Sequence, residues 1–158
     1  IPGQVAMLPL FLMLKGMGLV NSYSGVLIPS LAGIFGIFLV RQYARSLPDD
    51  ILEAARIDGA GEARLFVSVV LPLLKPVIVT LAVLVFLGSW NDFMWPLIVL
   101  TQSEVFTLQL GLSTFKGELN DNMHYLLAMT VLTLLPVTLV FVFLQKHITT
   151  GIANTGLK

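Results

Sequence analysis

Long runs of apolar residues without charge constrain this chain more than any other feature of its sequence. Residues 16–40 form a run of 25 positions and residues 125–145 a run of 21, and neither run contains a charged side chain. A third run, residues 76–100, carries one charge, Asp92. A helix of about 20 apolar residues crosses the hydrocarbon core of a bilayer and satisfies its own backbone polar groups. We therefore expect an all-α membrane protein with spans at about 24–41, 76–100 and 125–145.

A fourth apolar run lies at the start of the chain, over residues 1–14. As a helix it would reach about 21 Å, which is short of the ~30 Å hydrocarbon core. We interpret it as a span whose N-terminal part is missing, which makes a bundle of four spans with the first truncated. The chain begins Ile1-Pro2 and shows no basic segment followed by a small-residue cleavage site, so no signal peptide is expected. Residues 1–158 are expected to be one membrane domain of a longer protein.

The composition supports a lipid environment. The chain is 56% hydrophobic and only 11% charged, with a mean hydropathy of +0.91, whereas soluble domains have about a quarter charged residues. The formal net charge is zero, so no basic field favours binding to nucleic acid. The chain contains no cysteine, which excludes disulfides and thiolate-bound metal within it.

The distribution of basic residues predicts the orientation in the membrane. Lys15 and Lys116 would lie on one side of the spans. The other side would carry seven basic residues, which are Arg41, Arg45, Arg56, Arg64, Lys75, Lys146 and Lys158. Because basic residues are enriched on the cytoplasmic side, the loop at 46–75 and the C-terminus should be cytoplasmic. Residues 15–24 and 102–124 should face outward, with Trp90, Trp95 and Tyr125 near the outer boundary of the bilayer.

Residues 46–75, here named the charged loop, interrupt the apolar sequence with a dense amphipathic segment. Pro48, Asp49 and Asp50 predict a helix start, because proline suits the first turn and acids favour the positive end of the helix dipole. Residues 51–58 then form a short helix, on which Glu53 and Arg56 are spaced to pair. Gly59 and Gly61 predict a tight turn, with a positive φ expected at Gly59. A second helix should follow over residues 62–71 and end at Leu71-Pro72.

Two interpretations of the charged loop fit its pattern. An amphipathic hairpin can rest on lipid, and Leu65 and Phe66 provide an apolar side for that. The first helix instead presents Ala54 and Ala55 as a small, flat face flanked by charges. Such a face has little area to bury in lipid and fits better into a protein groove.

The same residues resemble a known family. The order Glu53-Ala54-Ala55, then Gly59, then Val69-Val70-Leu71-Pro72 resembles the EAA signature of binding-protein-dependent ABC importer permeases, with Val69 where isoleucine is usual. Flanking segments at 38–42, 55–60 and 90–93 are similar to the carbohydrate branch, in particular to the smaller permease of maltose-type importers. The ending Thr155-Gly156-Leu157-Lys158 departs from the family's usual Gly-Ala-Val-Lys-Gly tail.

The resemblance implies a function for the charged loop and a set of partners. Its first helix would dock into a groove of a cytoplasmic ATP-binding subunit, which acts as a dimer, binds ATP and Mg²⁺, and drives the cycle. A second permease subunit and an extracytoplasmic solute-binding protein would complete the importer in a bacterial inner membrane. The residues that carry this ATPase-coupling role are Glu53, Ala54, Ala55, Asp58, Gly59, Leu71 and Pro72.

The sequence gives no indication of an enzymatic reaction within this chain. None of the five lysines is followed by Ser or Thr, so a P-loop is absent and no nucleotide cofactor is expected in this chain. His124 and His147 are 23 residues apart on opposite predicted sides, so they cannot share a metal or catalytic site. We expect a transport subunit without enzymatic, metal or nucleic-acid function.

Asp92 is the one charge inside an apolar run, and an ionisable residue at membrane depth is a functional candidate. A helix of 19 steps from Leu73 to Asp92 spans about 29 Å, which places Asp92 near the outer interface. Asp92 is therefore either an interfacial carboxylate in an aromatic belt or part of the outer mouth of the pathway, together with Trp90 and Asn91. Residues 104–121 are either a solvated outer loop or a contact for the solute-binding protein.

The sequence does not identify the solute. A sugar or oligosaccharide is the main expectation. Glycerol phosphate or a polyamine would fit the same superfamily, and a membrane scaffold or secondary transporter without an ATPase is the rival from a different class.

Overall fold

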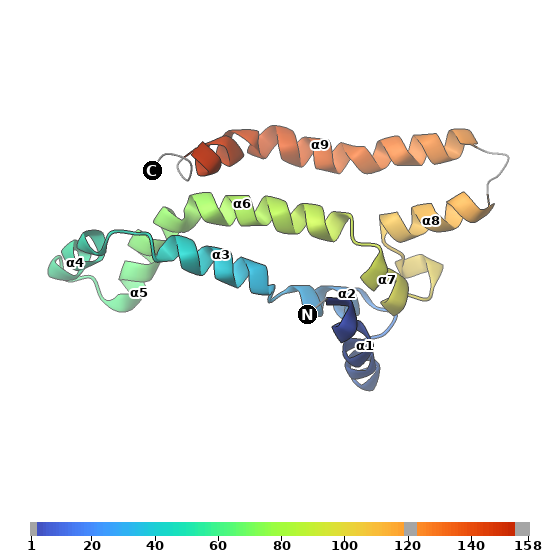
Figure 1. Ribbon diagram of the computed structural model, residues 1–158, viewed down its shortest axis with the longest axis horizontal. Helices are drawn as coiled ribbons and strands as arrows, with labels where there is room; N and C mark the ends of the chain where they lie inside the picture. Colours follow the sequence, from blue (N-terminus) through green and yellow to red (C-terminus); the bar gives the residue numbers. More distant parts are fainter. Residues whose placement is uncertain (1–2, 119–122, 154–158) are drawn as a thin grey trace. The chain divides into compact units, whose positions relative to one another are not determined.

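The computed structural model describes residues 3–118 and 123–153, and every regular element in these ranges is helical (Figure 1). The expectation of an all-α protein is thus confirmed. In chain order the elements are η1 (Gly3–Ala6), α1 (Met7–Gly16), α2 (Tyr23–Leu27), η2 (Ile28–Ser30), α3 (Ile34–Ala44), α4 (Asp49–Ile57), α5 (Glu62–Leu65), η3 (Phe66–Val70), α6 (Leu71–Trp90), α7 (Met94–Val99), η4 (Ser103–Val105), α8 (Leu108–Glu118) and α9 (Met123–Ala153).

Three helical stretches are long and apolar enough to cross a membrane. They cover Tyr23–Ala44, Glu62–Trp90 and Met123–Gln145, with 22, 29 and 23 residues. The helix at Gly3–Gly16 is shorter than a span. The stretch Tyr23–Ala44 is not one regular helix, because the chain passes through η2 and an irregular segment at 31–33 before α3 begins. Pro29 lies in η2, where its fixed φ and missing N–H suit a short 3-10 turn better than a continuing α-helix.

The chain forms two compact units. One contains residues 1–31 and 87–139, and the other contains residues 32–86 and 140–158. In the first unit α7 packs against α1 and α2 (Figure 1). Its buried apolar core consists of Leu14, Trp95, Val99, Leu100 and Leu110. Trp95 and Val99 are four residues apart on α7, so they lie on the same helix face and enter the core together.

Hydrogen bonds across large sequence separations hold this unit together. Asn21, which has a φ of 60°, accepts bonds at its side-chain oxygen from the backbone N–H groups of Thr101 and Gln102, both at 2.9 Å. The Trp95 indole Nε1–H donates to the Gly25 carbonyl oxygen over 3.2 Å, and the Trp90 indole donates to the Thr133 carbonyl oxygen over 3.3 Å. The Asn21 bonds join the turn after α1 to the segment after α7, and the two indole bonds join α7 to α2 and the end of α6 to α9.

The structure buries Trp95 and part of the segment after it. Trp95, whose position near the outer boundary of the bilayer stays a prediction, has only 8% of its surface exposed. Residues 104–121 were interpreted as a solvated loop or a partner contact. Within the described part of that segment, Val105 and Phe106 pack on the core, α8 begins at Leu108, and Leu110 is 1% exposed. Leu110 is the one buried side chain among residues 108–114 of α8, and the polar residues around it conceal this signal in the sequence. Lys116, Glu118 and Asp121 are outside the residues whose side chains the structure describes.

In the second unit, α4 and α5 are neighbouring short helices on either side of a turn (Figure 1). Leu74 and Val77 are three residues apart on α6 and are both about 5% exposed. Gly36 of α3 lies against Leu81 of α6, because a Cβ at Gly36 would come within 3.2–3.3 Å of the Leu81 methyl groups. A small residue at position 36 therefore permits close approach of these two helices.

The predicted span at 76–100 is wrong as a continuous helix. The helix α6 ends at Trp90, residues 91–93 are irregular, and α7 begins at Met94. Asn91 supports this end, since its side-chain Nδ2 donates to the Leu87 carbonyl oxygen over 2.8 Å. Asp92 supports the next start, because its carboxylate accepts a bond from the Trp95 N–H over 3.4 Å. These two short polar side chains bond to nearby backbone groups and so separate two helices that hydropathy alone merges.

Candidate functional site

The first helix of the charged loop is α4, and its start agrees with the sequence prediction. Pro48 precedes it with an extended backbone, and Asp49 and Asp50 occupy its first turn. Carboxylates at this position interact favourably with the positive end of the helix dipole. Arg56 lies in the last turn, where a cation complements the negative end.

Gly59 ends α4 in a left-handed conformation, with a φ of 81°. The Gly59 N–H donates to the Arg56 carbonyl over 3.0 Å, and the Ala60 N–H donates to the Ala55 carbonyl over 3.0 Å. This pair of bonds is the Schellman arrangement, which places a residue with positive φ just after the helix. The positive φ expected at Gly59 is thus confirmed. Gly61, two residues on, has a φ of −67° and only begins α5.

An ion pair closes the turn between the two helices. Arg56 Nε lies 3.2 Å from Glu62 Oε1, whereas the sequence spacing favoured a pair between Arg56 and Glu53. The Schellman turn reverses the chain and brings α5 beside the end of α4. The Glu62 carboxylate therefore lies within ion-pair distance of the Arg56 guanidinium. The side chains are 54% and 78% exposed, so the pair contributes little to stability.

The second helix of the charged loop does not end at Leu71-Pro72 as predicted. The chain continues from α5 through the π-helical turn η3 into α6 without a break in helical structure. The Leu71 N–H bonds to the Phe66 carbonyl five residues back. A proline in a regular α-helix clashes with the carbonyl four residues before it. A wider turn directly before Pro72 relieves that clash, so the helix passes through the proline into the span.

The predicted coupling residues are accessible and fall into two groups. Glu53, Ala54 and Asp58 are exposed on α4, Ala55 is half-buried there, and Gly59 caps that helix. Ile57, which the sequence analysis did not select, has 86% of its surface exposed at the end of α4. Leu71 and Pro72 are exposed on α6, beyond η3. The first group lies on and directly after α4, and the second lies at the start of α6.

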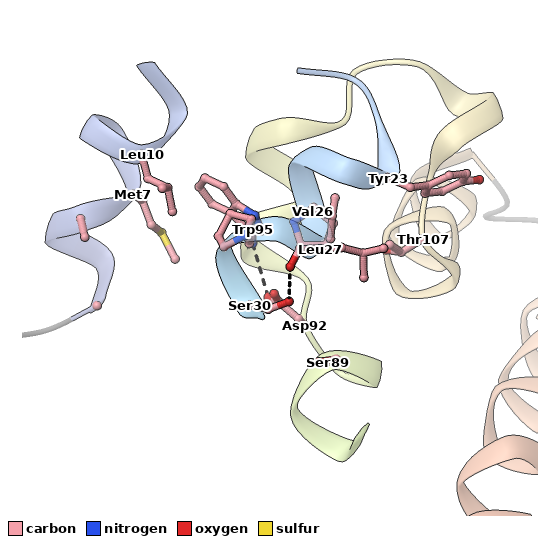
Figure 2. Close-up of a pocket in the computed structure, with 14 residues that line it drawn as sticks. Met7, Leu10, Tyr23, Val26, Leu27, Ser30, Ser89, Asp92, Trp95 and Thr107 are labelled. Carbon is pink, nitrogen blue, oxygen red and sulfur yellow. Dashed lines mark hydrogen bonds between the residues drawn. The ribbon is translucent and has the colours of Figure 1, made fainter. Parts of the chain in front are cut away.

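A second candidate site is a cavity of about 510 Å³ in the first unit. Tyr23 of α2, Ser30 of η2 and Ser89 of α6 contribute polar groups, Asp92 lines the cavity from the segment before α7, and Trp95 lines it from α7 itself. Figure 2 shows Trp95 on one side of Leu27 and Tyr23 on the other, with Asp92 and Ser89 lower in the view. The remaining wall is mostly apolar. The volume lies within the range of small-molecule sites, about 300–1,000 Å³.

The structure separates the three residues that were grouped at the outer mouth. Asp92 is half-buried and lines the cavity, whereas Trp90 and Asn91 do not. Trp90 bonds to the Thr133 carbonyl, and Asn91 is exposed and bonds back to Leu87. Tyr23 and Ser30 were missed, because they lie more than 60 residues from Asp92 and no local pattern joins them. Trp95 lies only three residues after Asp92, near the start of the next helix. Its proximity in the sequence could therefore have identified it as a candidate for the same site.

Among residues 3–118 and 123–153, no cluster of three or more His, Asp or Glu side chains could hold a metal ion.

The chain was compared with known proteins. Residues 1–154 match the family described as "Binding-protein-dependent transport system inner membrane component". The arabinooligosaccharides transport system permease protein AraQ of Bacillus subtilis (strain 168) is 41% identical over 158 residues, which is all of this chain and 56% of that protein. The melibiose/raffinose/stachyose import permease protein MelC of the same organism is 33% identical over 161 residues, covering 58% of that protein.

Two further similarities involve other solutes. The sn-glycerol-3-phosphate transport system permease protein UgpE of Salmonella typhi is 32% identical over 157 residues, which is 98% of this chain and 56% of that protein. A bacterial ABC transporter involved in the import of the acidic polysaccharide alginate has a crystal structure similar to this one, with a TM-score of 0.77 and 28% identity. That similarity covers 92% of this chain and 62% of the other.

The present chain spans a little over half the length of the curated relatives that it matches. Its match to the family nevertheless runs through almost the whole chain, from α1 through the charged loop to α9. The chain therefore belongs to the family of binding-protein-dependent transport system inner membrane components.

Proposed function

We propose that this chain belongs to a permease subunit of an ATP-driven importer, and that its solute is a sugar or oligosaccharide. The observation that carries the proposal is the charged loop. Its exposed helix α4 is followed by a tight glycine turn, and from α5 to the end of α6 the chain is helical throughout. A rigid element of this kind transmits a displacement of α4 into the membrane span. The family and the sugar permeases among the relatives support the same reading.

The proposed importer has further subunits. A dimer of cytoplasmic ATP-binding subunits binds ATP and Mg²⁺ and receives α4 in a groove. A second permease subunit completes the pathway, and an extracytoplasmic solute-binding protein delivers the solute. The charged loop and the C-terminus lie in the cytoplasm of a bacterial cell, which follows from the excess of basic residues on that side.

A second candidate solute is glycerol phosphate, which the 32% identity to the sn-glycerol-3-phosphate permease favours. We place it second because the sugar permease AraQ is more similar, at 41%.

The test of the proposed function is a charge reversal at Glu53 in the full-length permease, coexpressed with its ATP-binding subunits. Glu53 is exposed, and no ion pair involves it among the residues that the structure describes. Glu53→Lys should therefore leave folding intact, while the amount of copurified ATP-binding subunit and the sugar uptake fall about tenfold or more. A compensating charge reversal in the ATP-binding subunit should restore both.

The matched control is Glu104→Lys, which reverses another exposed carboxylate, in η4. It should leave copurification unchanged. Normal copurification and uptake with Glu53→Lys would contradict the coupling role of α4.

A further inference from the structure

The cavity in the first unit has one charged residue in its wall. Among the described residues that line it, Asp92 is the only one with an acidic or basic side chain. The chain holds this carboxylate in place, because one oxygen accepts the Trp95 N–H at the start of α7. The other oxygen has no hydrogen-bond partner among the described residues, and no ion pair neutralises the group there.

The aromatic side chains around Asp92 are also held in place. The Trp95 indole is 8% exposed and is tied to the Gly25 carbonyl, so the ring does not need to be ordered by a ligand. Tyr23 adds a second ring, which is 57% exposed at the other side of Leu27 (Figure 2). Aromatic faces pack against apolar C–H surfaces, and a carboxylate accepts bonds from hydroxyl groups. A sugar ring presents both kinds of surface.

We propose that this cavity is a subsite for a neutral sugar, and that Asp92 sets its selectivity by excluding anionic solutes. The inference rests on the proposed function and narrows the solute class. The relatives named above include permeases for neutral sugars, one for sn-glycerol-3-phosphate, and an importer of an acidic polysaccharide. A fixed carboxylate in a mostly apolar wall repels a phosphate or uronate with little screening by solvent. The same carboxylate accepts hydrogen bonds from the hydroxyl groups of a neutral sugar.

The experiment measures binding to the full-length permease, assembled with its partner subunits in lipid nanodiscs without the solute-binding protein. Equilibrium dialysis compares arabinotriose and raffinose, which are neutral, with digalacturonate, which is anionic. The wild-type complex should bind the neutral sugars about tenfold or more tightly than digalacturonate. Asp92→Asn keeps an oxygen for the Trp95 N–H and removes the charge. It should bring the ratio to within about threefold, mainly through tighter binding of digalacturonate.

The control is Glu104→Gln, which neutralises an exposed carboxylate outside the cavity and should leave the ratio unchanged. If the Asp92→Asn complex does not assemble, the ratio of neutral-sugar binding to digalacturonate binding measured for the wild type still tests the inference. Equal binding of the anionic and neutral probes by the wild type, no binding of either, or an unchanged ratio in Asp92→Asn would overturn it.

A separate assay distinguishes this inference from the proposed function. The complete importer with its solute-binding protein is tested for ATP-dependent uptake of neutral sugar. If the importer takes up neutral sugar but the binding assay shows no selectivity, only the subsite inference is contradicted. A wild-type importer that moves no sugar, but transports glycerol phosphate or another solute, removes the proposed function as well.

Discussion

Gly25 is the glycine with the least room for an added side chain among the described glycines of the first unit. A Cβ at this position would overlap the Leu19 carbonyl oxygen and would lie 3.0 Å from Val99 Cγ1. The Leu19 oxygen belongs to the backbone and cannot move like the end of a flexible side chain. The Gly25 carbonyl also accepts the Trp95 indole bond, so a shift of this segment loses that contact.

We expect Gly25→Ala to destabilise the protein by about 1–3 kcal/mol, which is the usual cost of overpacking. The measurement is the melting temperature of the purified full-length protein in detergent. Gly88→Ala is the matched control, because a Cβ there meets nothing within 4 Å. It lies inside α6, where alanine is the better helix former, so its melting temperature should be unchanged or slightly raised. Equal melting temperatures for both variants would show that the segment around Gly25 adapts.

The charged loop contains two glycines that differ in their backbone conformation. Gly59 has a φ of 81°, whereas Gly61 has a φ of −67°, and a Cβ at either position would meet nothing within 4 Å. A substitution at Gly59 is therefore strained by the backbone alone, at a cost of about 1–2 kcal/mol. The same substitution at Gly61 is not strained.

We predict that Gly59→Val leaves membrane insertion near normal, because the strain is small and confined to the turn. It should alter the orientation of α5 relative to α4, so that copurified ATP-binding subunit and solute uptake both fall steeply. Gly61→Val, with the same added side chain two residues away, should retain most of both activities. If the two variants behave alike, the positive φ of Gly59 is not what the loop requires.

For the whole molecule, the orientation in the membrane is a prediction from the distribution of basic residues. The two sides can be probed at Asp50, which is exposed in the first turn of α4, and at Ser103, which is exposed in η4. The chain contains no cysteine, so a single cysteine introduced into it is unique within these residues.

We expect Ser103→Cys to react with a membrane-impermeant thiol reagent in intact cells. Asp50→Cys should react only after the membrane is permeabilised, because the charged loop is cytoplasmic. A permeant reagent that labels both positions serves as the control. The reverse pattern would invert the topology and would remove the charged loop from contact with a cytoplasmic ATP-binding subunit.

The sequence by itself determined the features that depend on neighbouring residues. Apolar runs of span length predict membrane helices, acids after Pro48 predict the start of α4, and Gly59 predicts the turn with positive φ, since each signal acts within a few residues. Only the tertiary structure decided what depends on distant partners. Asn21 meets Thr101 across 80 residues and Gly25 meets Trp95 across 70, so no local pattern reveals that Trp95 is buried. The cavity around Asp92 arises in the same way, because Tyr23 and Ser30 come together with Asp92 only through packing of residues 3–30 against residues 89–107.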